Sequence, residues 1–180
     1  SVEIKNPFNL QAGKDDKLTI VDIKAVDSLG RMIDIEVQSL ASMEFTHRSL
    51  YYWAQMYAEQ LGKGRIYGEL KPVICINLLN SELFPQIEDY HSIWTIQERD
   101  NRGVQFSDHL TIHCLEIPKL KESQNASALE KWMRYFTVEG ESNMAVMNEL
   151  LKDNEPLQKV HQRYEQFMAS DEHRELWLSR

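Results

Sequence analysis

The sequence has few cysteines: Cys75 and Cys114 are the only two among 180 residues. Both lie in apolar runs, VICINLL and IHCLEI, where a free thiol is typically buried. Small secreted domains usually carry a denser, even set of cysteines joined as disulfides. We therefore expect two buried free thiols and a cytoplasmic protein.

Long apolar runs are also missing. No segment reaches the roughly 18–20 consecutive apolar residues of a membrane-spanning helix, and no signal-peptide pattern is present. The sequence has no P-loop, no glycine-rich dinucleotide motif and no serine nucleophile elbow, and it shows no internal repeat. These absences exclude several enzyme classes and predict no membrane partner.

Positive charge is scarce, because 28 Asp and Glu outnumber 20 Lys and Arg and give a net charge of -8. No basic run is present, although nucleic-acid-binding domains usually carry a basic face. This argues against tight DNA binding through charge alone. It does not exclude a nuclease, because a bound metal ion can bridge acidic side chains to a phosphate.

What the sequence does contain is a hairpin pattern, LTIVDIKAVDSLGRMIDIEVQ, over residues 18–38. Apolar and charged residues alternate on both sides of a turn at residues 28–30, which is typical of two antiparallel strands. We expect the apolar positions to pack under a helix. These positions are Val21, Ile23, Ile33, Ile35 and Val37.

The register of this hairpin brings two carboxylates together. If Asp27 pairs with Arg31, then Asp22 lies opposite Glu36 and Lys24 lies opposite Asp34. Directly opposed Cβ atoms are about 4.5–5.5 Å apart, and two carboxylates at that spacing suit a hard divalent ion such as Mg²⁺. The alternative interpretation is a solvated polar face on which Lys24 pairs with Asp34.

A helix and a buried strand follow the hairpin. Ser42 is a plausible N-cap, and the apolar stripe of the helix contains Leu50, Trp53, Ala54, Tyr57 and Leu61. Arg48 and Tyr52 are four residues apart and share a second face. The continuous apolar run at residues 73–79 predicts a central strand. Hairpin, helix and strand together predict an α/β fold with a mixed sheet and a crossover helix.

The remaining chain divides into two parts. Residues 80–118 contain strand-like runs at 92–98 and 110–117, which predict a second hairpin that extends the sheet. We expect His113 there to be structural and His47 on the helix to be a surface residue. Helical periodicity continues to the end, so we divide the chain into a core of residues 1–118 and a helical region of residues 119–180.

Several of these stretches together resemble one family. The order of the acidic hairpin and the Arg- and Tyr-rich helix is similar to the PD-(D/E)XK nuclease superfamily, and more narrowly to the recombination-promoting, Rpn-type PD-(D/E)XK nuclease family transposases. The stretches that carry the likeness are NPFNLQAGKDDKLTIVDIKAVDSLGRMIDIEVQ, FTHRSLYYWAQMYAEQL, GRIYGELKPVICINLL, HCLEIPKL and LEKWMRYF. The resemblance implies a restriction-endonuclease-like fold, and a chain that lacks the family's N-terminal segment and C-terminal tail.

The resemblance also implies a function and a set of site residues. Asp22 and Glu36 would bind Mg²⁺ or Mn²⁺ with the carbonyl of Val37, and Gln38 would stand where the wider superfamily has lysine. Val21-Asp22 replaces the Pro-Asp of the superfamily name. The catalytic residues would be Asp22, Glu36 and Gln38.

Partners follow from the same likeness. DNA would be the substrate, contacted by Arg48 and Tyr52, and the C-terminal helices would offer a homodimer surface. The expected activity is that of a metal-dependent DNA endonuclease in transposition or recombination. The alternative is a degenerate nuclease fold that acts as an interaction or regulatory module.

Overall fold

The structure is a computed structural model, and it describes residues 2–5, 22–121, 126–137 and 144–169. The chain forms two compact units, Ser1–Leu120 and Lys121–Arg180, which are described separately below.

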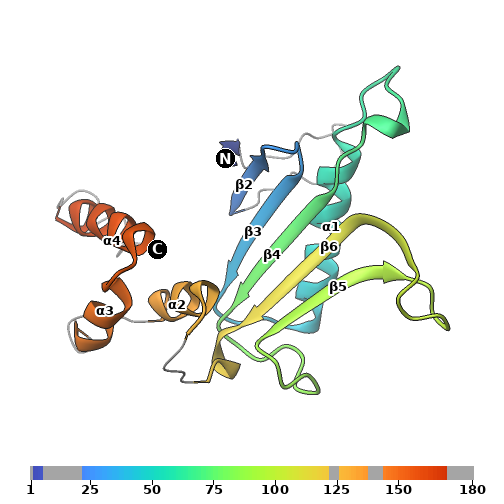
Figure 1. Cartoon of the computed structure of the whole chain (residues 1–180). Helices are drawn as coiled ribbons and strands as arrows, with labels where there is room; N and C mark the ends of the chain where they lie inside the picture. Colours follow the sequence, from blue (N-terminus) through green and yellow to red (C-terminus); the bar gives the residue numbers. More distant parts are fainter. Residues whose placement is uncertain (1, 6–21, 122–125, 138–143, 170–180) are drawn as a thin grey trace. The chain divides into compact units, whose positions relative to one another are not determined.

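The first unit is built on a six-stranded sheet with the order β1-β2-β3-β4-β6-β5 (Figure 1). Its strands are β1 Val2–Lys5, β2 Ile23–Asp27, β3 Met32–Gln38, β4 Val73–Leu79, β5 His91–Gln97 and β6 Gln105–Glu116. β3 pairs with β4 and β4 with β6 in parallel, while the other neighbours are antiparallel. The predicted α/β class with a mixed, restriction-endonuclease-like sheet is confirmed.

Helix α1, Met43–Ala58, makes the crossover between β3 and β4 and covers one face of the sheet (Figure 1). Parallel neighbours require such a crossover, so the sequence order of hairpin, helix and strand already determines this topology. Ser42 is the N-cap residue as predicted, although its side chain makes no capping hydrogen bond. A short 3₁₀ helix, Tyr67–Glu69, lies between α1 and β4.

The predicted apolar stripe on α1 is wrong in part. Leu50 is exposed, and the residues that α1 buries are Phe45, Ser49 and Met56. The buried face of α1 includes a serine because the sheet beneath it is partly polar: Ser49 and Asn77 of β4 hydrogen-bond to each other.

Two apolar clusters hold α1 to the sheet at either end of this polar contact. One consists of Phe45, Leu79, Leu83, Phe84 and Cys114. The other consists of Met56, Val73 and Cys75, against which Tyr52, Trp53 and Tyr57 pack. Both cysteines are free and buried, as predicted. Apolar packing therefore lies on both sides of the polar contact between α1 and β4.

The hairpin has the predicted register, but the face that is buried is the charged face and not the predicted apolar face. Lys24 pairs with Asp34, and the amide of Asp27 donates to the carbonyl of Arg31. The apolar positions are not packed under a helix, because Ile23 is 41% and Val37 54% exposed. It is the charged face that turns towards α1; Val21 lies outside the described residues.

The segment after β4 is fixed by a buried carboxylate. Glu116 at the end of β6 accepts hydrogen bonds from the amides of Leu83 and Phe84, and Lys119 pairs with it at 2.8 Å. Burial alone would raise the pKa of Glu116, but Lys119 and these amides outweigh it and lower the pKa. Lys119 belongs to a short 3₁₀ helix, Ile117–Lys119, that ends the strand.

The predicted hairpin of strands β5 and β6 is present. His113 of β6 lies 2.9 Å from His91 of β5, nitrogen to nitrogen, and is partly buried. Burial and the neighbouring His91 lower the pKa of His113. The interpretation of His113 as a structural residue agrees with this placement.

The second unit contains α2 Ala128–Tyr135, α3 Met144–Leu151 and α4 Glu155–Met168. Ser127 and Glu130 form a reciprocal capping box that starts α2. Leu150 and Leu157 are buried, whereas Val160 and Tyr164 of α4 are exposed. In the described part of the chain no helix has the length and apolar character needed to cross a membrane.

Candidate active site

Asp22 and Glu36 meet at the open end of the β2–β3 hairpin. The amide of Asp22 donates to Oε1 of Glu36 at 3.0 Å, and Oδ2 of Asp22 accepts from the amide of Val37 at 2.9 Å. The two acids are therefore cross-strand neighbours, as the register predicts. Each acid also fixes the backbone of the other's strand.

Burial differs between the two acids. Glu36 is 3% exposed beneath α1, whereas Asp22 is exposed at the strand end. Burial raises the pKa of Glu36 most; the amide of Asp22 lowers it, the Asp22 carboxylate raises it, and Arg48 lowers it. The raised pKa shows that these contacts do not fully compensate a charge on Glu36.

A third carboxylate, Asp34, lies on the same face of β3. It is fully buried, and within the described ranges no N–H or O–H group donates a hydrogen bond to its oxygens, which leaves the Cys75 thiol as their polar neighbour. Burial and the Glu36 carboxylate raise the pKa of Asp34 to about 7, although Cys75, its register partner on β4, opposes the shift through its thiol. Asp34 was not among the predicted site residues.

Lys24 of β2 is a cation on the same face as these acids. It lies opposite Asp34, is 6% exposed, and forms an ion pair with Glu59 just beyond the end of α1. The interpretation of this face as merely solvated is therefore wrong, because α1 covers it.

Val37 and Gln38 complete the strand end. The side-chain amide of Gln38 donates to the carbonyl oxygen of Val37 at 2.9 Å. This carbonyl is the predicted third oxygen ligand. Gln38 thus contacts the carbonyl oxygen of Val37, which is one of the proposed ligands of a bound ion.

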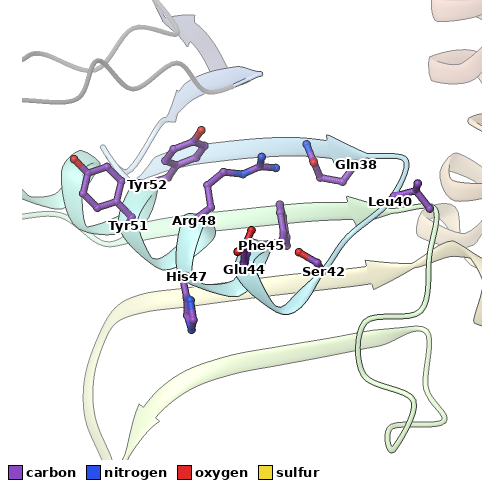
Figure 2. A pocket seen from close by; sticks show the side chains of 9 residues that line it. All are labelled: Gln38, Leu40, Ser42, Glu44, Phe45, His47, Arg48, Tyr51 and Tyr52. Carbon is purple, nitrogen blue, oxygen red and sulfur yellow. The ribbon is translucent and has the colours of Figure 1, made fainter.

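Arg48 and Tyr52 project from α1 on the side of Gln38. In Figure 2 the Arg48 side chain extends between Tyr52 and Gln38, and its guanidinium lies 5.0 Å from the centre of the Phe45 ring. Burial and the carboxylate of Glu36 raise the pKa of Tyr52. The structure therefore brings both predicted DNA-contacting residues beside the acids.

His47 is exposed, as predicted, and points away from Gln38 (Figure 2).

The donor set is suited to a hard cation. Within the described residues, no group of three His, Cys, Asp or Glu side chains could hold a metal ion. The hairpin end offers instead two carboxylates, Asp22 and Glu36, and one backbone carbonyl, Val37. Oxygen donors of this kind fit Mg²⁺ or Mn²⁺. The raised pKa of Glu36 is a second sign of fit, because a cation would offset the charge that burial disfavours.

A mixed sheet with a parallel β3–α1–β4 crossover and an acidic hairpin end defines a restriction-endonuclease-like nuclease fold. A family model described as PD-(D/E)XK nuclease family transposase matches residues 1–180. The chain therefore belongs to this family, as the hairpin and helix motifs predicted. No curated protein and no solved structure gives a significant match to the chain.

Proposed function

We propose that this chain is a metal-dependent DNA endonuclease in which Asp22, Glu36 and the carbonyl of Val37 hold Mg²⁺ or Mn²⁺. One observation carries the proposal: in the hairpin register, the amide of Asp22 donates to the carboxylate of Glu36 and the amide of Val37 donates to the carboxylate of Asp22, next to a face that α1 covers. A purely structural hairpin has no need of two apposed acids, which repel each other. Membership of the family supports nuclease chemistry.

The residues around the acids have complementary roles. A divalent ion bound there would supply a water of lowered pKa and neutralise charge on the scissile phosphate. Gln38 orients that water or donates to a phosphate oxygen, and Arg48 binds a phosphate beside Tyr52. Water attacks phosphorus directly and releases a proton to solvent, the bond from phosphorus to the sugar oxygen breaks, and that oxygen takes a proton from solvent, without a covalent enzyme intermediate.

Three further proposals accompany the proposed endonuclease function. DNA is the macromolecular partner, because the family comprises nuclease-type transposases. The exposed apolar side chains of the C-terminal helices, such as Val146 and Tyr164, support a homodimer through these helices. The buried free thiols support a cytoplasmic protein.

A non-catalytic interaction module is the second candidate. One observation favours it: the residue beside the acids is an uncharged glutamine, Gln38. In addition, the described residues contain no group of three His, Cys, Asp or Glu side chains that could hold a metal ion. Such a module would keep the fold and bind partners without hydrolysis.

One pair of measurements separates the candidates. Supercoiled plasmid is incubated with the chain and Mg²⁺ or Mn²⁺, and the thermal unfolding temperature is followed in a metal titration. We expect nicking and a metal-dependent rise in unfolding temperature, both lost in Asp22→Ala. Asp100→Ala in the exposed β5–β6 turn is the matched control and should behave like the parent. Absence of both responses in the parent supports the module.

A further inference from the structure

A pocket of about 520 Å³ opens on α1 next to Gln38 (Figure 2). Ligand-binding pockets usually measure about 300–1,000 Å³, so this one is large enough for a small organic group. Its walls come from the end of β3, the loop that follows it, and α1 as far as Tyr52. It therefore adjoins the acidic hairpin end within a single unit of the fold.

The lining combines aromatic rings with a cation. Phe45, Tyr51 and Tyr52 line the pocket together with Arg48. Tyr51 is 40% exposed, and its hydroxyl accepts a hydrogen bond from Gln55 at 2.7 Å, which fixes the direction of the ring. Aromatic faces on which bases stack, beside a cation for the backbone, are characteristic of single-strand binding sites.

Two of these residues link the pocket to the acids. The charge of Arg48 acts on Glu36, and the charge of Glu36 acts on Tyr52. In Figure 2 the Arg48 side chain lies between Tyr52 and Gln38. A phosphate held by Arg48 would therefore lie next to the hairpin end, with the attached base directed along α1.

The lining also limits what the pocket can accept. Glu44 is part of it and would repel a second phosphate, whereas an uncharged base meets no such penalty. A base within a duplex is covered on both faces by its neighbours and must leave the stack to enter a pocket. The pocket therefore fits an unpaired base more readily than paired DNA.

We propose that this pocket binds one unpaired nucleotide of the DNA strand being cut, with its base stacked on Tyr51 and its phosphate on Arg48. The inference rests on the proposed endonuclease function and narrows its substrate to single-stranded or locally unpaired DNA. Stacking is tolerant of base identity, because every base has a π face. The pocket is therefore expected to select DNA structure rather than sequence.

The test compares three labelled DNAs of one sequence: a matched duplex, the same duplex with a central two-nucleotide gap, and the single strand. The ratio of kcat/KM for unpaired over matched substrate is measured with Mg²⁺ for the parent, Tyr51→Ala and Tyr51→Phe. Loss of one stacking contact corresponds to about 5- to 150-fold. We expect the ratio to fall by this amount in Tyr51→Ala and to be retained in Tyr51→Phe. Tyr67→Ala, which removes an exposed tyrosine outside the pocket, is the control.

The outcomes separate the pocket from the catalytic site. If the parent cuts DNA but Tyr51→Ala keeps the parent's ratio, the pocket proposal is wrong and the endonuclease proposal stands. If the parent cuts nothing, the endonuclease proposal fails, and anisotropy with a fluorescent ten-nucleotide thymidine strand then decides the pocket. Binding that weakens in Tyr51→Ala and not in Tyr67→Ala supports the pocket, and equal binding by both variants overturns it.

Discussion

The carboxylates of Asp22 and Glu36 each accept a hydrogen bond from a backbone amide of the opposite side of the hairpin. The amide of Asp22 donates to Glu36, and Asp22 accepts from the amide of Val37, the residue after Glu36. Each bond uses one oxygen of its carboxylate, and the other oxygen of each can bind a cation. The backbone thus holds the two acids in place before any metal binds, which is the preorganisation that a catalytic site needs.

Glu36→Gln is expected to keep the fold and to raise stability at neutral pH, while abolishing cleavage. Burial raises the pKa of Glu36, so its ionised form is disfavoured in the folded chain. That destabilisation develops as the pH rises above the unfolded pKa, and an uncharged amide avoids it. Urea unfolding at pH 4 and pH 8 should show a higher free energy of unfolding than the parent's for the variant only at pH 8. Glu82→Gln, at an exposed position, is the control. A large loss of stability would mean that Glu36 is instead a structural partner.

Asp34 is expected to make stability fall as the pH rises from about 4 to about 7. Burial and the Glu36 carboxylate raise the pKa of Asp34 from 3.8 to about 7, so in this window the unfolded chain binds fewer protons than the folded one. The full effect corresponds to on the order of 4 kcal/mol. Asp34→Asn should flatten this part of the pH profile of the free energy of unfolding. Asp100→Asn, at an exposed position, should leave the profile unchanged.

The sequence was sufficient for the hairpin register. A side-chain period of two and a short turn leave one register that aligns both alternating strands, and Lys24 is indeed opposite Asp34. The crossover helix followed from the order of the elements. These features depend on local pattern and on topology, which a single sequence carries.

The buried face of the hairpin could not be predicted in this way. Alternation tells which residues share a face, and apolar residues are usually the covered ones. Here α1 covers Lys24, Asp34 and Glu36 instead, because Glu59 pairs with Lys24 and Ser49 meets Asn77. These partners are 28 to 35 residues apart in sequence, so no local pattern reveals them.

Lys24→Met is expected to destabilise the chain by about 3–5 kcal/mol, the typical cost of breaking a buried ion pair by removing one partner. The reason is that Glu59 and Asp34 would then lack their nearby cation. The double variant Lys24→Met with Glu59→Leu should recover part of the loss. Urea unfolding of the two single variants and the double variant gives the coupling free energy. Additive losses would show that the Lys24–Glu59 pair contributes nothing of its own.

Gln38 is the residue at which the proposed chemistry differs most from the lysine of the wider superfamily. Its amide donates to the carbonyl of Val37 at 2.9 Å, so it already lies against a proposed metal ligand. An amide can donate a hydrogen bond to water or phosphate, but it carries no charge and is not a base at neutral pH. The divalent ion must then supply more of the charge stabilisation, and we expect activity to depend steeply on its concentration.

Gln38→Ala is expected to remain folded and to cut DNA about 10²–10³ times more slowly, the typical effect of removing one preorganised donor. Gln38→Lys should retain or exceed the parent's activity, because lysine still donates and adds a positive charge beside the acids. Single-turnover plasmid cleavage across a Mg²⁺ series measures both variants, with Gln97→Ala on the exposed edge of β5 as control. If Gln38→Ala cuts DNA as fast as the parent, Gln38 is not part of the active site. The roles proposed for the residues that follow Glu36 would then be wrong as well.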